Sequence, residues 1–199
     1  ADLLTVRDGP FGESIDTFNS RAFAVCDHQI AHVYVRSASD LELVAATLEP
    51  VDGIARVLDQ RAKMAIGLEH PRCGDLVLQA RNDTWLAYPY WLDDRRAPDF
   101  ARTVDIHRKP GYDPLELFLD PTLFAPKLRV AGRLLRKKLG MRYLMDVVPL
   151  DTSLVGGSHG VLPIDRDEGP VFLSDDPEAG SHLQSLADLK DYSLGRIGL

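Results

Sequence analysis

The sequence of 199 residues has few cysteines, no surplus of basic residues and no long apolar run. Two cysteines, Cys26 and Cys73, are too few for a disulfide framework, and their apolar or strand-like neighbours predict free thiols in a reducing compartment. The formal net charge of -7 argues against a nucleic acid polymer as partner, because binding one relies on an excess of Lys and Arg.

Several sequence signals are also missing. No apolar stretch reaches the length of a transmembrane helix, and no signal-peptide pattern opens the chain, so we expect a cytoplasmic protein with no membrane partner. Zinc-finger spacing, a Walker loop and a dinucleotide fingerprint are absent. The chain begins at Ala1 rather than at methionine, which leads us to expect a processed product, a tag-cleaved protein or a fragment.

What the sequence does contain is ordinary for a globular protein, with 45% hydrophobic and 27% charged residues. Short apolar runs predict strands, and stretches with helical periodicity predict helices. We expect strands at 22–26, 30–35, 53–58 and 75–80, a hairpin partner at 84–88, and helices at 40–49, 60–66, 126–139 and 183–191. Ser39 and Glu42 have the spacing of a capping box. The alternation of strands and helices predicts an α/β or α+β architecture.

Residues 92–142 differ from the rest, because repeated prolines break any long helix before 126. We interpret this stretch as a loop-rich cap or insertion. Its one helix has an apolar stripe and many cations, namely Lys127, Arg129, Arg133, Arg136, Lys137 and Lys138. These cations could meet a phosphate-rich partner or a membrane surface, but we favour a merely solvated helix face.

Two histidines are candidate metal ligands. His159 lies in the loop Gly156-Gly157-Ser158-His159-Gly160, where glycines let the backbone approach a charged group closely. Asp27 and His28 end an apolar run, and an adjacent carboxylate and imidazole at a strand end can hold a divalent metal. The alternatives are an incidental histidine in a surface turn and polar punctuation between two strands.

A third candidate region is the turn-rich segment 105–114. His107, Arg108 and Tyr112 are candidate substrate-binding residues, because a guanidinium suits phosphate oxygens and a phenol ring can stack on a base. The alternative is a surface loop held by its own ion pairs.

The order of several segments resembles the type I phosphodiesterase and nucleotide pyrophosphatase branch of the alkaline phosphatase superfamily, including phosphonoacetate hydrolase-like members. The matching segments are 31–35, 53–58, Arg72-Cys73-Gly74-Asp75-Leu76-Val77-Leu78, Gly157-Ser158-His159-Gly160 and 169–172. The resemblance covers most of the chain from about Arg21 onward, and it gives little support to the insertion.

The resemblance implies that residues 1–199 form a single domain that is the C-terminal part of a larger hydrolase domain. The expected fold is an alkaline phosphatase-like α/β sandwich, with a mixed sheet flanked by helices. It also implies two divalent metal ions, usually zinc, with His159 as one ligand and a Thr or Ser nucleophile upstream of this chain. Asp27 and His28 resemble the family's Asp-His-Gly only in part, because Gln29 follows them.

Two functions follow as expectations. In the first, the chain is a segment of an enzyme that hydrolyses a small phosphate ester or phosphonate. In the second, it is a non-catalytic module of the same fold that binds a ligand or partner. An isolated half of such a sandwich would expose sheet surface, which predicts aggregation or a homodimer.

Overall fold

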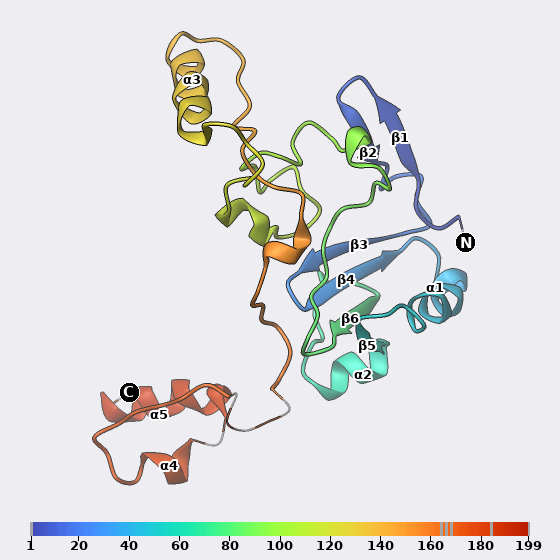
Figure 1. The fold of residues 1–199 in the computed structure, drawn as a ribbon. Coiled ribbons are helices and arrows are strands. Elements are labelled where there is room, and N and C mark those ends of the chain that lie inside the picture. Colours follow the sequence, from blue (N-terminus) through green and yellow to red (C-terminus); the bar gives the residue numbers. More distant parts are fainter. Residues whose placement is uncertain (1, 164, 166, 168, 184, 199) are drawn as a thin grey trace. The chain divides into compact units, whose positions relative to one another are not determined.

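The computed structural model describes residues 2–163, 165, 167, 169–183 and 185–198, and the chain divides into two compact units, Ala1–Leu162 and Pro163–Leu199 (Figure 1). The sequence predicts that residues 1–199 are part of one larger hydrolase domain, and the division into two units does not test this prediction. Across the described ranges, none of the helices combines the length and the apolar composition needed to cross a bilayer.

The described residues of the first unit, 2–162, form six strands, three α-helices and short 3₁₀ turns. The strands are β1 (Val6–Gly9), β2 (Gly12–Ile15), β3 (Ala22–Asp27), β4 (Ile30–Val35), β5 (Ile54–Leu58) and β6 (Leu76–Ala80). The helices are α1 (Leu41–Leu48), α2 (Gln60–Ala65) and α3 (Pro126–Lys138). The 3₁₀ helices of this unit are Ala38–Asp40, Asp94–Arg96, Pro114–Leu117 and Thr152–Leu154.

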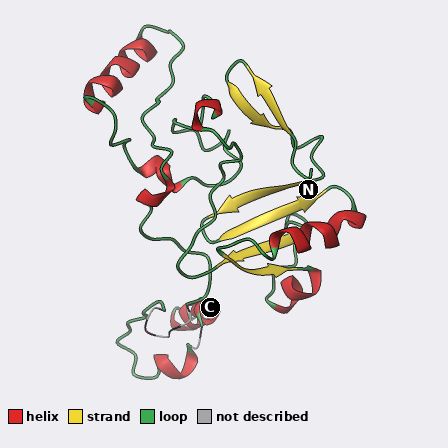
Figure 2. Ribbon diagram, turned by 45° about the vertical axis from the view of Figure 1, so that its right-hand side comes forward, coloured by secondary structure: helices red, strands yellow, loops and turns green. Residues whose placement is uncertain are grey.

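The strands form two antiparallel sheets, which places the protein in the mixed α/β class (Figure 2). The first is the β1–β2 hairpin, and the second is a four-stranded sheet in the order β3-β4-β6-β5. Every pair of named strands in the described residues is antiparallel, so the mixed sheet expected from the sequence is not found there. One cause is the short turn at His28 and Gln29, because parallel neighbours need a long crossover between them.

The core of this unit lies where α1 packs on one face of the four-stranded sheet. Val44 of α1, 2% exposed, belongs to the same buried cluster as Ala31 and Val33 of β4 and Leu76 and Leu78 of β6. The paired register Ala31↔Leu78 and Val33↔Leu76 places these four strand residues on a common face. Burial of this face keeps the β3–β4 hairpin in a fixed position, and the end of that hairpin carries the candidate site.

Residues 92–142 are loop-rich, as expected. All of them are described, and their helical elements are two 3₁₀ turns, Asp94–Arg96 and Pro114–Leu117, and helix α3. Around them, Tyr88, Trp91, Phe100 and Ala101 form a second buried cluster. Lys109 is completely buried there, and its ammonium forms ion pairs of 2.7 Å with both Asp113 and Glu116. Whether this segment acts as a cap stays a prediction.

The predicted strands at 22–26, 30–35, 53–58 and 75–80 and the helices at 40–49, 60–66 and 126–139 are confirmed to within a few residues. The predicted hairpin partner at 84–88 is wrong, because this segment forms no strand. Its Leu86 N–H donates instead to the carbonyl of His28, so the chain crosses the end of the β3–β4 hairpin. The predicted capping box is also wrong, since α1 begins after Asp40 without a side-chain cap.

In its described residues, the second unit contains two short α-helices, α4 (Ala179–His182) and α5 (Leu189–Arg196). The final helix was predicted at 183–191, but α5 begins only at Leu189, after a 3₁₀ turn at Leu186–Asp188. The reason is local, because Ser185 caps that 3₁₀ turn in a capping box with Asp188.

Candidate functional site

The centre of the candidate site is His28, at the tip of the β3–β4 hairpin. Its φ of 53° is in the left-handed region, which is uncommon for a residue other than glycine. Neighbouring segments hold the turn in this conformation. The His28 carbonyl accepts from Leu86 N–H at 2.7 Å, and the Gln29 carbonyl accepts from Ala80 N–H at 2.8 Å. Backbone strain at a turn persists only where surrounding contacts fix it, and functional sites are common locations for it.

The glycine-rich loop that carries His159 lies against this turn. Gln29 N–H donates to the carbonyl of His159 at 3.0 Å. The imidazoles of His28 and His159 have ring centroids 3.9 Å apart and are tilted by 33°. Ser158 Oγ lies 3.0 Å from Nδ1 of His28, within hydrogen-bond distance. The loop and the hairpin tip, far apart in sequence, therefore form one surface.

A second segment reaches His28 from the other side. The N–H of Tyr112 donates to the carbonyl of Cys26 at 2.9 Å, and the phenol ring stacks on the imidazole of His28 with centroids 5.0 Å apart. Gly111 makes this approach possible, because a Cβ at this position would lie 2.0 Å from the Cys26 carbonyl oxygen. Its φ of 125° is also one that other residues rarely adopt.

The surroundings of His28 lower its pKa from the ordinary value. Partial burial is the main cause, because it disfavours the charged imidazolium, and the neighbouring His159 adds to the effect. Asp27 acts in the opposite direction, but does not outweigh them. At neutral pH His28 is therefore a neutral imidazole, the form that can accept a proton or bind a metal through a ring nitrogen.

The other predicted site residues are placed differently. Arg108 directs its guanidinium to Asp99, at 2.8 Å, and lies over the ring of Phe100. Within the segment 105–114, Arg108 also forms a longer ion pair with Asp105, at 3.9 Å. His107 is exposed, and Asp27 is exposed beside His28. The substrate-binding role of His107 and Arg108 stays a prediction.

Two contributors to the site were missed in the sequence analysis. Ser158 was noted only as part of the glycine-rich loop, although its place beside His159 was a usable signal. Gln29 was noted only as a departure from a motif. Its side chain is buried, and Nε2 points at the carbonyls of Arg81, Asn82 and Thr84, at 3.1 to 3.3 Å, which anchors the hairpin tip.

The donors around His28 do not complete a metal site. Within the described ranges there is no group of three or more His, Cys, Asp or Glu residues that could hold a metal ion. His28 and His159 offer two imidazoles, whereas zinc in proteins takes about four ligands, three of them from protein even in catalytic sites. The described residues can therefore supply only part of a zinc site.

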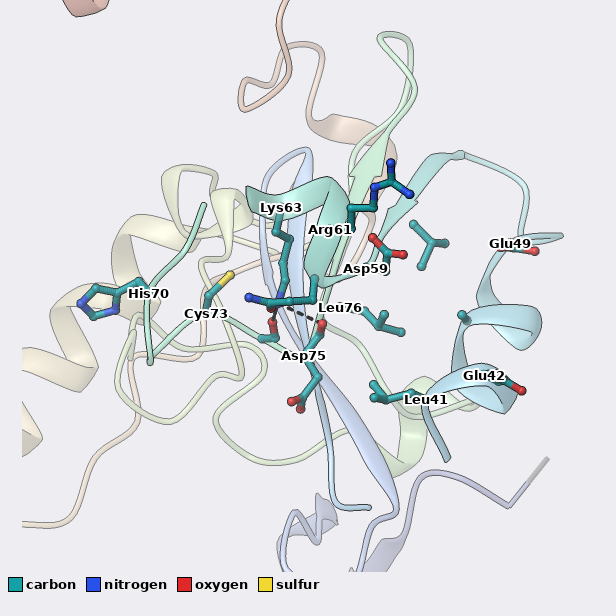
Figure 3. A pocket seen from close by; sticks show the side chains of 14 residues that line it. Leu41, Glu42, Glu49, Asp59, Arg61, Lys63, His70, Cys73, Asp75 and Leu76 are labelled. Atoms are coloured by element: carbon teal, nitrogen blue, oxygen red, sulfur yellow. Dashed lines mark hydrogen bonds between the residues drawn. The ribbon is translucent and has the colours of Figure 1, made fainter. Parts of the chain in front are cut away.

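A pocket of about 660 Å³ lies elsewhere, between α1, β5, α2 and the start of β6 (Figure 3). Lys63 is buried at its base and donates to the carbonyls of Gly74 and Asp75, at 2.6 and 3.0 Å. None of the predicted site residues lines this pocket. Because two backbone carbonyls accept hydrogen bonds from the Lys63 ammonium, the burial of Lys63 has a structural explanation. We therefore assign no reaction or ligand to this pocket.

Comparisons with known proteins identify no relative: no family model, no curated protein and no solved structure matched the chain.

Proposed function

We propose that this chain is the C-terminal segment of a metal-dependent phosphoric ester hydrolase of the phosphodiesterase and nucleotide pyrophosphatase type. The observation that supports it best is the contact between His28 and His159, with ring centroids 3.9 Å apart. The resemblance assigned a metal-binding role to His159 from its loop alone. A second imidazole beside it adds a nitrogen donor of the type that zinc sites use.

In this proposal the chain contributes one wall of the active site. His159 is a nitrogen ligand, and Ser158 orients the neutral imidazole of His28 beside it. Tyr112 offers an exposed ring that can stack on an aromatic part of the substrate. The metal ions, when bound, stabilise negative charge on the phosphoryl oxygens. The nucleophile and the remaining ligands come from upstream residues, which also complete the alkaline phosphatase-like sandwich around the four-stranded sheet.

The substrate class in this proposal is a small phosphate ester or phosphonate. The alternative is a non-catalytic module of the same fold that binds a ligand or partner. It is favoured by the small number of metal donors among the described residues. The two functions are distinguished by one measurement. A full-length protein that includes the upstream segment turns over substrate if it is the hydrolase, and does not if it is the binding module.

The test is hydrolysis of bis-p-nitrophenyl phosphate by the full-length gene product, with His159→Ala and with His70→Ala as a matched control. We expect turnover that a chelator abolishes and zinc restores. For His159→Ala we expect kcat/KM to fall about 10²-fold or more, because losing even a residue that supports a metal ligand typically costs about 10- to 100-fold. His70, an exposed histidine outside the site, should be dispensable. Full activity of His159→Ala would refute its role as a ligand, and binding without turnover would favour the module.

The chain of 199 residues provides a second test. We expect it to contain little zinc by elemental analysis and to show no turnover, because its described residues supply too few ligands. Near-stoichiometric zinc together with turnover would mean that a complete site exists here, which contradicts the proposal that this is one segment of the enzyme.

A further inference from the structure

Helix α3 presents an apolar stripe to solvent. Leu128, Leu135 and Leu139 are 74%, 56% and 63% exposed, and Phe124 just before the helix is 97% exposed. The spacing of these leucines places them on one face of the helix. Figure 1 shows α3 projecting from the loops that lead to it, and the structure buries none of its residues. The stripe that a globular protein would pack against its core is therefore uncovered.

Cations border this stripe on both sides. With 3.6 residues per turn, Arg136 and Lys138 lie about 80° to either side of Leu128, and Lys127 lies about 100° away. The helix contains no acidic residue between Pro126 and Lys138. Within the part of the chain that the structure describes, these three cations form no ion pair.

The opposite side of α3 is attached to the protein. Arg129 and Arg133 both form ion pairs with Asp146, and Lys137 lies over the ring of Tyr143. These contacts hold the helix in one orientation, with its leucines directed away from the segment 141–146. An amphipathic helix oriented in this way, with leucines outward and cations beside them, has the pattern of a helix that lies in a membrane interface.

We propose that α3 docks the protein onto an anionic lipid surface, with the leucines entering the acyl boundary and the cations contacting lipid phosphates. From the sequence we had favoured a solvated face, and the exposure of the leucines is the observation that changes this interpretation. Charge complementarity selects the partner. A second copy docking through the same helix would place Lys127, Arg136 and Lys138 against the same three cations of its partner.

The net negative charge of the whole chain does not prevent this docking. At physiological ionic strength, screening limits electrostatic effects to about 8 Å, so the local cations of α3 dominate at the membrane surface. Each cation close to an anionic bilayer contributes about fivefold to the affinity, equivalent to about 1 kcal/mol.

The test is co-sedimentation of the 199-residue chain with phosphatidylcholine vesicles prepared with and without phosphatidylserine. We expect binding only to the anionic vesicles, weakened by salt. Leu128→Gln with Leu135→Gln should abolish it, and Lys127→Gln with Arg136→Gln and Lys138→Gln should weaken it about 100-fold. Because these side chains are exposed, the variants should remain folded, which circular dichroism checks.

Matched controls use an exposed leucine and an exposed cation outside α3. Leu92→Gln and Arg61→Gln should bind the anionic vesicles like the unaltered chain. Absence of binding by the unaltered chain would overturn the proposal. So would binding that survives the two leucine substitutions, because it would indicate attraction to any polyanion, such as an acidic protein. The assay requires neither zinc nor turnover, so its outcome is independent of the proposed hydrolase activity.

Discussion

The imidazoles of His28 and His159 contact each other, with ring centroids 3.9 Å apart, although His28 lies in the turn after β3 and His159 in a late loop. The contact depends on backbone hydrogen bonding as well as on the rings, because Gln29 N–H donates to the carbonyl of His159. The neighbouring His159 contributes to the lowering of the His28 pKa, which provides a direct way to detect the contact in solution.

We expect the pKa of His28, measured by NMR titration of its ring protons, to lie below the ordinary value of 6.5. His159→Ala should raise the pKa of His28, because the substitution removes a neighbouring group that lowers it. Asp27→Asn should lower it further, because Asp27 is the group that favours the imidazolium. A pKa that does not respond to His159→Ala would show that the two rings are not in contact.

The same shift makes stability depend on pH. Because the pKa of His28 is lower in the folded than in the unfolded chain, the unfolded chain binds more protons between the two values. The folded state therefore loses stability as the pH falls from 6.5 through the folded pKa of His28. His28→Asn should reduce this loss, since Asn tolerates the left-handed backbone and does not titrate there. Urea unfolding at several pH values measures the difference.

Gly111 is expected to tolerate no side chain. In Gly111→Ala, the new Cβ would lie 2.0 Å from the Cys26 carbonyl oxygen, so the loop must move and separate Tyr112 from His28. We expect a lower unfolding midpoint and a change in the ring resonances of His28. Gly157→Ala is the matched control, because a Cβ at Gly157 would have only its own residue and its two chain neighbours within 4 Å. Equal effects of the two substitutions would contradict this prediction.

Lys109 should be among the residues most sensitive to substitution. Lys109→Ala leaves the buried carboxylates of Asp113 and Glu116 without their cation, and breaking a buried ion pair in this way costs about 3–5 kcal/mol. Chemical denaturation measures the change. Arg95→Ala breaks an exposed ion pair with Asp93 and should leave the midpoint almost unchanged. A mild effect of Lys109→Ala would mean that the three groups do not meet in a dry interior.

The two thiols should differ in reactivity. Burial raises the pKa of the Cys26 thiol to about 11, so very little reactive thiolate is present at pH 8. Cys73 is only partly buried. A thiol reagent should therefore modify one cysteine rapidly in the folded chain and both in denaturant, and Cys73→Ser should remove the rapid phase. Rapid modification of Cys26 in that variant would show that the end of β3 opens readily.

The sequence by itself determined the elements whose signal is local. The runs that became β3, β4, β5 and β6 combine strand-forming residues with short length, and α3 follows from helical periodicity between Pro126 and Gly140. The glycine-rich loop drew attention to His159 in the same way. Each of these predictions depends on neighbours in the chain, so no knowledge of distant residues was required.

Only the tertiary structure decided which of these elements meet. Leu86 was predicted to lie in a hairpin, but its N–H donates to the carbonyl of His28, because a bond to a distant segment outweighed local strand propensity. The meeting of Tyr112, His28 and His159 depends on Gly111 and on the hairpin tip, which are not close in sequence. The stripe of α3 was readable from its periodicity, but periodicity cannot say whether another element covers it. That depends on packing, and in this structure Leu128 and its neighbours face solvent.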